Sequence, residues 1–159
     1  TGGYLSVDGD YIVLTDTEKI LSIGRYIVNT AASSSTQMQY DTVDKQKQIV
    51  ITLPSLFKDD RYISIITESI MEQMRQEMRA TNLEKIYWIH DAGLPEDELF
   101  DPFTSIKPDQ NFYITEEGKL VIVFDEYEVA PGYMGIVEFE IPTELLADVL
   151  VSNEYIQNN

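Results

Sequence analysis

The sequence predicts an α+β domain in which helices pack on one face of an antiparallel β-sheet of five or more strands, a two-layer sandwich. Two observations support this fold class. Several short β-prone runs are joined by compact turn residues, as in antiparallel hairpins. One longer segment, residues 59–79, carries a helical apolar stripe that requires a sheet to cover it.

Length and composition indicate a folded, acidic domain. With 159 residues, 43% of them hydrophobic and 11% aromatic, we expect residues 1–159 to form a single domain with a substantial core. The 28 acidic and 11 basic residues give a net charge of −17. Such a charge repels nucleic acid and anionic membranes and attracts cationic partners, although it can also serve solubility alone. The sequence contains no cysteine, which excludes disulfides and thiol catalysis.

Residues 1–58 are expected to form the N-terminal strands. The β-prone runs in this part lie at residues 4–7, 11–15, 20–29, 37–43 and 48–53. Gly24, inside the longest run, is expected to mark a β-bulge. The polar residues 44–47 separate the last two runs and predict a hairpin.

Residues 30–36 consist of alanine and hydroxyl-bearing side chains only. Their composition favours a flexible connection between two strands. The alternative is a flat contact surface at Ser33, Ser34 and Ser35, where a partner approaches closely and hydroxyl groups adapt their hydrogen bonds.

Residues 59–79 are predicted to form the main helix. Asp59 or Asp60 can accept a hydrogen bond from the free N–H groups at its start. The apolar residues that follow recur every three or four positions: Ile63, Ile66, Ile70, Met74 and Met78. This stripe is typical of a helix packed on a sheet rather than of a cofactor site.

Residues 110–151 are predicted to form a C-terminal module of strands and a final helix. Glu117-Gly118 is a turn between strands at 112–115 and 120–124, because glycine accepts positive φ without steric cost. A further strand is expected at 136–141. Pro142 is expected to begin a helix over 143–151, and residues 153–159 are expected to fray.

The loop between the last two strands contains the turn Pro131-Gly132, followed by Tyr133 and Met134. Loop tips usually carry small polar residues, so these two side chains allow two interpretations. They can fold under the loop onto the sheet, as in many compact loops. Alternatively, the loop is a rigid recognition element whose tyrosine anchors a partner.

Catalytic motifs are not found in the sequence. His90 is the only histidine, and there is no nucleophile elbow, phosphate-binding loop or dinucleotide fingerprint. Asp125, Glu126 and Glu128 are the best candidates for a carboxylate acid/base pair, but neighbouring strand-end carboxylates point in alternating directions. We therefore expect no enzyme activity, no catalytic residue, no cofactor and no metal.

The C-terminal segments FYITEEGKLVIVFDEYEVAPGYMG and EFEIP resemble the RsiV family, bacterial membrane-anchored anti-sigma factors whose extracellular domain is a lysozyme receptor. Residues 30–35, 56–58 and 73–76 resemble the same family in the same order. A similar module accompanies polysaccharide deacetylases of the bacterial cell wall.

The resemblance implies an extracellular sensor domain of a single-pass membrane protein. Lysozyme, a cationic secreted muramidase, would be its partner, and its binding would trigger regulated proteolysis by site-1 and site-2 proteases. An ECF-type sigma factor would bind a cytoplasmic segment expected upstream of this sequence. The contact residues that this interpretation predicts are Ser33, Ser34, Ser35, Tyr127, Glu128, Pro131, Gly132, Tyr133 and Met134.

The alternative function is a cell-wall glycan-binding module associated with polysaccharide deacetylation. In that case Tyr127, Tyr133 and Trp88 would stack on sugar rings. The acidity of the chain is poorly matched to anionic wall polymers, which favours lysozyme as the partner.

Overall fold

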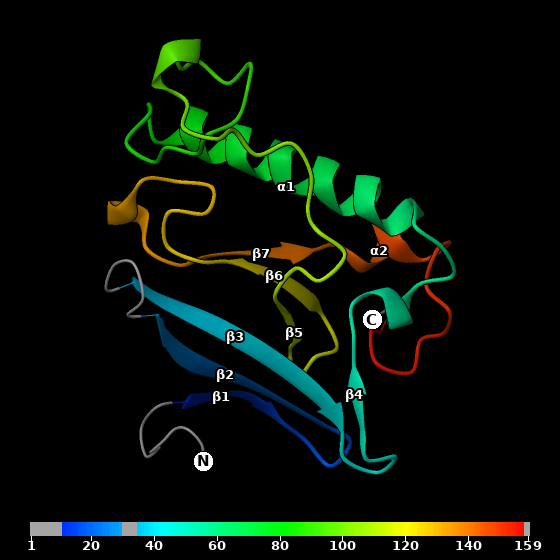
Figure 1. Cartoon of the computed structure of the whole chain (residues 1–159). Helices are drawn as coiled ribbons and strands as arrows, with labels where there is room; N and C mark the ends of the chain where they lie inside the picture. The colour runs from blue at the N-terminus through cyan, green and yellow to red at the C-terminus, as the bar shows by residue number, and fades with distance from the viewer. Residues whose placement is uncertain (1–10, 30–34, 158–159) are drawn as a thin grey trace.

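The computed structural model describes residues 11–29 and 35–157 and shows two antiparallel sheets and one long helix (Figure 1). The first sheet has the order β1-β2-β3-β4 and the second β5-β6-β7. The strands are β1 Tyr11–Asp16, β2 Ile20–Asn29, β3 Ser35–Asp44, β4 Ile49–Ile51, β5 Phe112–Ile114, β6 Leu120–Phe124 and β7 Val137–Ile141. The helices are α1 Arg61–Ala80 and α2 Thr143–Leu146, with short 3-10 turns at Pro54–Leu56, Glu96–Glu98 and Gly132–Met134.

The predicted α+β class with antiparallel strands is confirmed, but a single sheet of five or more strands is wrong. The described strands divide into sheets of four and three. β4 itself is short, and Pro54, three residues after its end, has no N–H with which to continue a ladder. The run 4–7 lies outside the described residues.

The second sheet lies between α1 and the first sheet, so the molecule has three layers (Figure 1). In β6, Leu120, Ile122 and Phe124 belong to the core formed with α1. Val121 and Val123, on the opposite face, pack against Met38 and Tyr40 of β3. This burial on both faces explains why the sequence of β6 is apolar throughout instead of alternating.

The bulge of the first sheet lies in β1 and not at Gly24 of β2. The register of β1 with β2 shifts between Val13 and Thr15, whereas Gly24 pairs regularly with Ile12 and Tyr40. A Cβ at Gly24 would lie 2.8 Å from the Cε atom of Met38. The absence of a side chain at Gly24 leaves room for the end of the Met38 side chain, so this glycine serves close packing and not a bulge.

Helix α1 agrees with its prediction to within one or two residues. Asp59 accepts a hydrogen bond from the backbone N–H of Arg61 at 3.0 Å, as expected for a group that satisfies the helix start. Ile63 is only partly buried, and Tyr62 takes its place in the core, stacked on Phe57 with 4.5 Å between ring centroids. The segment 86–89 forms no strand or helix, although Tyr87 and Ile89 in it are buried.

The C-terminal segment differs from its prediction in two respects. α2 ends at Leu146 because the next residues pair with the chain before α1: Leu150 bridges to Phe57, and the N–H of Val151 donates to the carbonyl of Leu56. Residues 153–157 are docked rather than frayed. Ile156 is buried, so its apolar side chain holds this segment against the core.

Candidate functional site

The loop of residues 125–135, between β6 and β7, separates the two tip residues that the sequence analysis treated together. Pro131 leads into the 3-10 turn Gly132–Met134. Tyr133 is 66% exposed, whereas Met134 is partly buried and packs on the core. The tyrosine therefore projects from the loop and the methionine anchors it.

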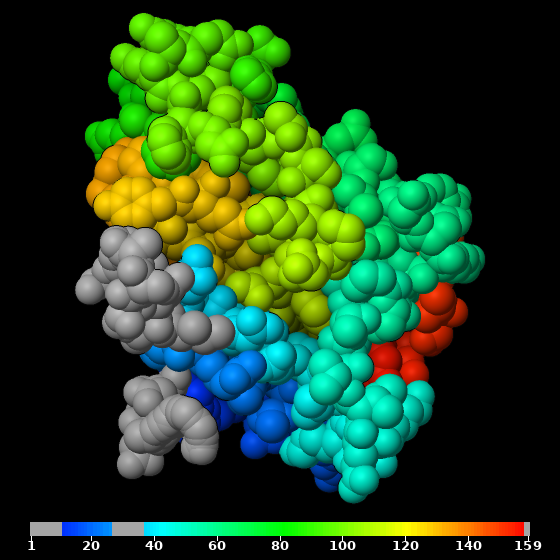
Figure 2. All heavy atoms as spheres, viewed as in Figure 1, coloured from blue at the N-terminus to red at the C-terminus, as the bar shows by residue number. Residues whose placement is uncertain are grey.

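The Tyr133 hydroxyl donates a hydrogen bond to the carbonyl of Glu84 at 2.7 Å. Glu84 belongs to the segment that follows α1, so this bond joins two loops at one end of the molecule. Figure 2 shows the green residues of this segment above the yellow and orange 125–135 loop. Two more exposed apolar residues lie near this bond in the sequence: Leu83, next to Glu84, and Ile136, three residues after Tyr133.

Tyr127 lies on the outside of the same loop and contacts Gly132. Its backbone has φ of 69°, which is uncommon for a bulky residue, and its side chain is 63% exposed. A Cβ atom at Gly132 would overlap the phenol of Tyr127. The Tyr127 ring can therefore lie directly against position 132 because glycine carries no side chain there.

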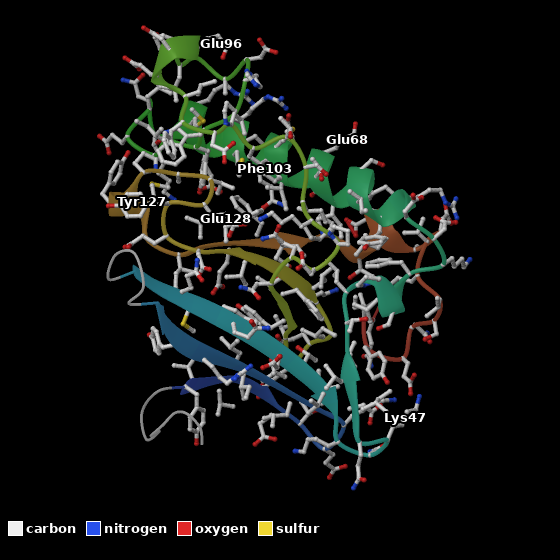
Figure 3. All side chains as sticks on the ribbon, in the orientation of Figure 1. Lys47, Glu68, Glu96, Phe103, Tyr127 and Glu128 are labelled. Atoms are coloured by element: carbon white, nitrogen blue, oxygen red, sulfur yellow. The ribbon has the colours of Figure 1, made fainter. Side chains whose placement is uncertain are left out.

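Glu128, one of the predicted contact residues, uses both of its carboxylate oxygens for hydrogen bonds within the domain. One of its oxygens accepts a hydrogen bond from the backbone N–H of Asp125 at 2.9 Å, and the other accepts one from the side-chain amide of Gln110 at 3.1 Å. Figure 3 shows Tyr127 at the edge of the molecule and Glu128 pointing inward. The carboxylate closes the loop from inside, since both of its oxygens bond within the domain.

Asp125 connects the loop to the first sheet. Its carboxylate accepts a hydrogen bond from the backbone N–H of Met38 in β3 at 3.0 Å. Partial burial raises the pKa of Asp125, and the nearby charge of Glu128 adds to the rise, while the bond from Met38 opposes it. Met38 is the fourth residue of β3, which begins at Ser35, so this bond brings the start of the strand next to the loop. Ser33 and Ser34 lie outside the described residues.

An acidic hollow with a volume of about 760 Å³ lies between β3 and the loop. It is lined by Gln37, Met38, Gln39, Lys107, Asp109, Gln110, Asn111 and residues 125–128. A second acidic region lies nearby in residues 91–101, where Phe100 is 67% exposed and contacts Trp88 edge-on with 5.4 Å between ring centroids. Carboxylates and exposed aromatic side chains therefore occur together at this end of the molecule.

The histidine and the loop carboxylates Asp125 and Glu128 are hydrogen-bonded or ion-paired within the part of the chain that the structure describes. There, no three side chains of the metal-binding types are grouped closely enough to hold an ion. His90 pairs with Glu96 at 3.0 Å on the surface. Asp125 and Glu128 each bond to backbone or amide donors within the domain.

Between residues 35 and 157, no helix is long and apolar enough to cross a membrane.

Residues 54–144, more than half of the chain, match the model of a family described as a protein of unknown function, DUF3298. The chain belongs to the DUF3298 family. The matched part of the chain includes α1, the second sheet and the 125–135 loop. Strands β1–β4 precede the matched residues.

The anti-sigma-V factor RsiV of Bacillus subtilis (strain 168) is 54% identical to the chain over 155 residues, covering 98% of the chain. The matched residues make up 52% of RsiV, so the chain spans about half the length of this relative. This similarity also includes the four-stranded sheet that lies outside the family model. It confirms that the chain is similar to RsiV over nearly its whole length, as the resemblance in the sequence predicted.

Two solved structures share the fold. A crystal structure of a DUF3298 family protein from Pseudomonas aeruginosa PAO1 has a TM-score of 0.63 and 16% identity, covering 93% of this chain and 64% of its own. The crystal structure of a DUF3298 family member from Bacteroides fragilis NCTC 9343 has a TM-score of 0.62 and 19% identity. The match covers 90% of this chain and 53% of the Bacteroides chain. At these identities the two structures establish the fold alone.

The residues that sequence reasoning missed are those that join the loop to β3. Gln110 and Asn111 precede β5 in a stretch that the sequence marks only as a loop, yet both bond to distant backbone groups. Their partners are up to 73 residues away along the chain, so no local pattern could have indicated them.

Proposed function

We propose that this domain is the extracellular sensor of a membrane-anchored anti-sigma factor and that it binds a cationic muramidase-type lysozyme. The observation that carries this proposal is the 54% identity to RsiV over 98% of the chain, together with the resemblance that the sequence itself shows to a family of lysozyme receptors. The net charge of −17 favours a cationic partner.

The 125–135 loop provides the anchor in this proposal. Pro131 and Gly132 shape the turn, and Tyr133 presents an exposed ring whose hydroxyl is already oriented by Glu84. A rigid tyrosine offers a large contact area at a small entropic cost. Entry of Pro131 and Tyr133 into the substrate cleft of lysozyme would place an aromatic ring where a sugar ring normally binds, and would inhibit the enzyme.

Signalling would follow from binding. In the proposed order of events, lysozyme binding to the domain makes the anti-sigma factor a substrate for site-1 and site-2 proteases. Their cleavage releases an ECF-type sigma factor from the cytoplasmic segment of the anti-sigma factor. The domain itself acts as a receptor without catalytic activity.

Calorimetric titration tests the proposal directly. The 159-residue chain is titrated in parallel with lysozyme and with chitooligosaccharides, and the muramidase activity of lysozyme is measured with and without the domain. We expect saturable binding and inhibition of lysozyme. Binding of the oligosaccharide but not of lysozyme would instead support the glycan-binding alternative, in which the exposed rings of Tyr127 and Tyr133 stack on sugars.

A further inference from the structure

The edge of β3 that faces the second sheet is only partly paired by a strand. β4 pairs with Thr42, Val43 and Asp44 of β3 and then ends. Further back along the same edge, the backbone groups of Met38 and Tyr40 are bonded by side chains instead of by another strand. Unpaired edge groups are costly when buried, so these side chains take the place of a missing strand.

Asn111 supplies two of these bonds. Its side-chain N–H donates to the carbonyl of Met38 at 2.9 Å, and its side-chain oxygen accepts from the N–H of Tyr40 at 3.3 Å. Its own carbonyl accepts a bond from the N–H of Val123 in β6 at 2.9 Å. One residue therefore binds β3 through its side chain and β6 through its backbone.

Asp125 supplies the third bond and is also the first residue of the loop. Its carboxylate accepts from the N–H of Met38, and its own N–H donates to Glu128. The other oxygen of Glu128 accepts from Gln110, which is only 6% exposed and also donates to the carbonyl of Val123 at 3.2 Å. We call these four side chains, Gln110, Asn111, Asp125 and Glu128, the polar clamp.

We propose that the polar clamp is a positioning device that holds the 125–135 loop and the start of β3 in one fixed arrangement before the partner binds. The inference rests on the proposed function, because Tyr133 of the loop and the segment at Ser35 are the two parts of the proposed lysozyme contact. The four clamp residues act through these segments and need not touch lysozyme themselves. This assigns Glu128 to positioning the loop instead of pairing with a basic partner residue.

Preorganisation explains why such a network would affect affinity. A loop that is already held in its bound geometry loses little conformational entropy on association. Two contact segments that come from different sheets also need a fixed relative position to bind one rigid partner. The clamp provides this connection where the two sheets lack a continuous backbone ladder.

Three variants test the clamp through binding. Asn111→Leu removes both side-chain bonds at similar size, and we expect it to weaken lysozyme binding by about tenfold or more. Asp125→Asn keeps an acceptor for the N–H of Met38 and should change affinity by less than about threefold. Ser22→Ala is the matched control, because it breaks the buried 2.7 Å hydrogen bond between Ser22 and Thr42 within the first sheet without touching the clamp. It should lower the melting temperature and leave the affinity unchanged.

A spectroscopic measurement separates positioning from general stability. The sequence has no cysteine, so a single pair of nitroxide labels can be introduced by Gln37→Cys in β3 and Glu126→Cys in the loop. In the otherwise unchanged domain, pulsed electron–electron double resonance should give a narrow distance distribution. We expect this distribution to broaden with Asn111→Leu and to stay narrow with Ser22→Ala.

The outcomes distinguish the two proposals. If the unaltered domain does not bind lysozyme, the proposed function is wrong, whatever the labels report. If the unaltered domain binds and Asn111→Leu binds equally well, or keeps a narrow distance distribution, the clamp has no positioning role. An affinity loss with Asn111→Leu that Ser22→Ala reproduces would also overturn the inference, since general destabilisation would then account for it.

Discussion

The hydroxyl of Tyr133 donates a hydrogen bond of 2.7 Å to the backbone carbonyl of Glu84, while the residue stays 66% exposed. The two residues are 49 positions apart in the chain. The bond holds the tip of the side chain in place and leaves the ring surface to solvent. An exposed side chain held in this way is suited to recognition, because little of its rotational freedom remains to be lost on binding.

Tyr133→Ala should therefore weaken lysozyme binding by about 2 kcal/mol or more, as is typical of a central aromatic anchor. It should barely change the melting temperature, because the residue contributes little to the core. The control is Phe124→Ala in β6, which should lower the free energy of unfolding by about 3–5 kcal/mol, because Phe124 is almost fully buried. Calorimetry and thermal melts of both variants give the comparison. Unfolding of the domain by Tyr133→Ala would show that Tyr133 is a structural residue.

Gly132→Ala should affect binding more than stability. The new methyl group would overlap the Tyr127 phenol, but that exposed ring can swing away, so the free energy of unfolding should change by only about 0.5 kcal/mol. Displacing Tyr127 from the contact surface should weaken lysozyme binding by about tenfold, or about 1.4 kcal/mol.

Tyr127→Ala provides the partner variant for this test. In that background Gly132→Ala has no ring to displace, so a double-mutant cycle should show clear non-additivity in binding. Additive losses would mean that the contact between the two residues is irrelevant to recognition.

Association with lysozyme should slow as salt rises. A domain with a net charge of −17 attracts a cationic protein over a distance limited by the Debye length, about 8 Å at physiological ionic strength. Surface plasmon resonance between about 50 and 500 mM salt should show a falling association rate and a smaller change in dissociation. An association rate that is independent of salt would contradict electrostatic steering.

Ser34→Trp tests the second predicted contact segment, in which Ser33 and Ser34 lie outside the described residues and Ser35 begins β3. A bulky side chain in a flat contact should block lysozyme binding by steric overlap, while the melting temperature and circular dichroism stay unchanged. Wild-type affinity in this variant would reduce the segment to a connection between β2 and β3.

The C-terminal segment should lend the fold a pH-dependent stability. The Tyr155 hydroxyl donates to Asp44 at 2.6 Å, and this bond is the main reason why the pKa of Asp44 is lowered, followed by bonds from the backbone of the 44–48 turn. A lowered folded-state pKa means that the stabilisation is present above the unfolded pKa, about 3.9, and is lost as pH falls through the folded value. Tyr155→Phe removes the largest cause of the shift.

Urea unfolding of wild type and Tyr155→Phe at pH 7 and near pH 2 measures this effect. The difference in stability between the two proteins should be larger at pH 7 and should shrink as the pH falls through the lowered folded-state pKa of Asp44. Equal differences at both pH values would show that the bond does not depend on the charge of Asp44.

Local patterns predicted the elements whose causes lie within a few residues. Gly118 has φ of 77°, as the turn between β5 and β6 requires, and its conformational freedom was evident from the sequence. The spacing of Ile66, Ile70, Met74 and Met78 similarly predicted α1 and its buried face. In both cases the deciding interactions are local, namely a steric limit on φ and the period of the helix.

The arrangement of the proposed binding surface depended on the tertiary structure. Asn111 and Asp125 meet the edge of β3 only because the two sheets pack together, and neither residue has a local feature that indicates such a bond. The same packing decides that Tyr133 projects while Met134 is anchored in the core. The sequence by itself therefore determined the family, the helix and the hairpin turns, whereas the division into two sheets and the position of the loop result from contacts between residues far apart in the chain.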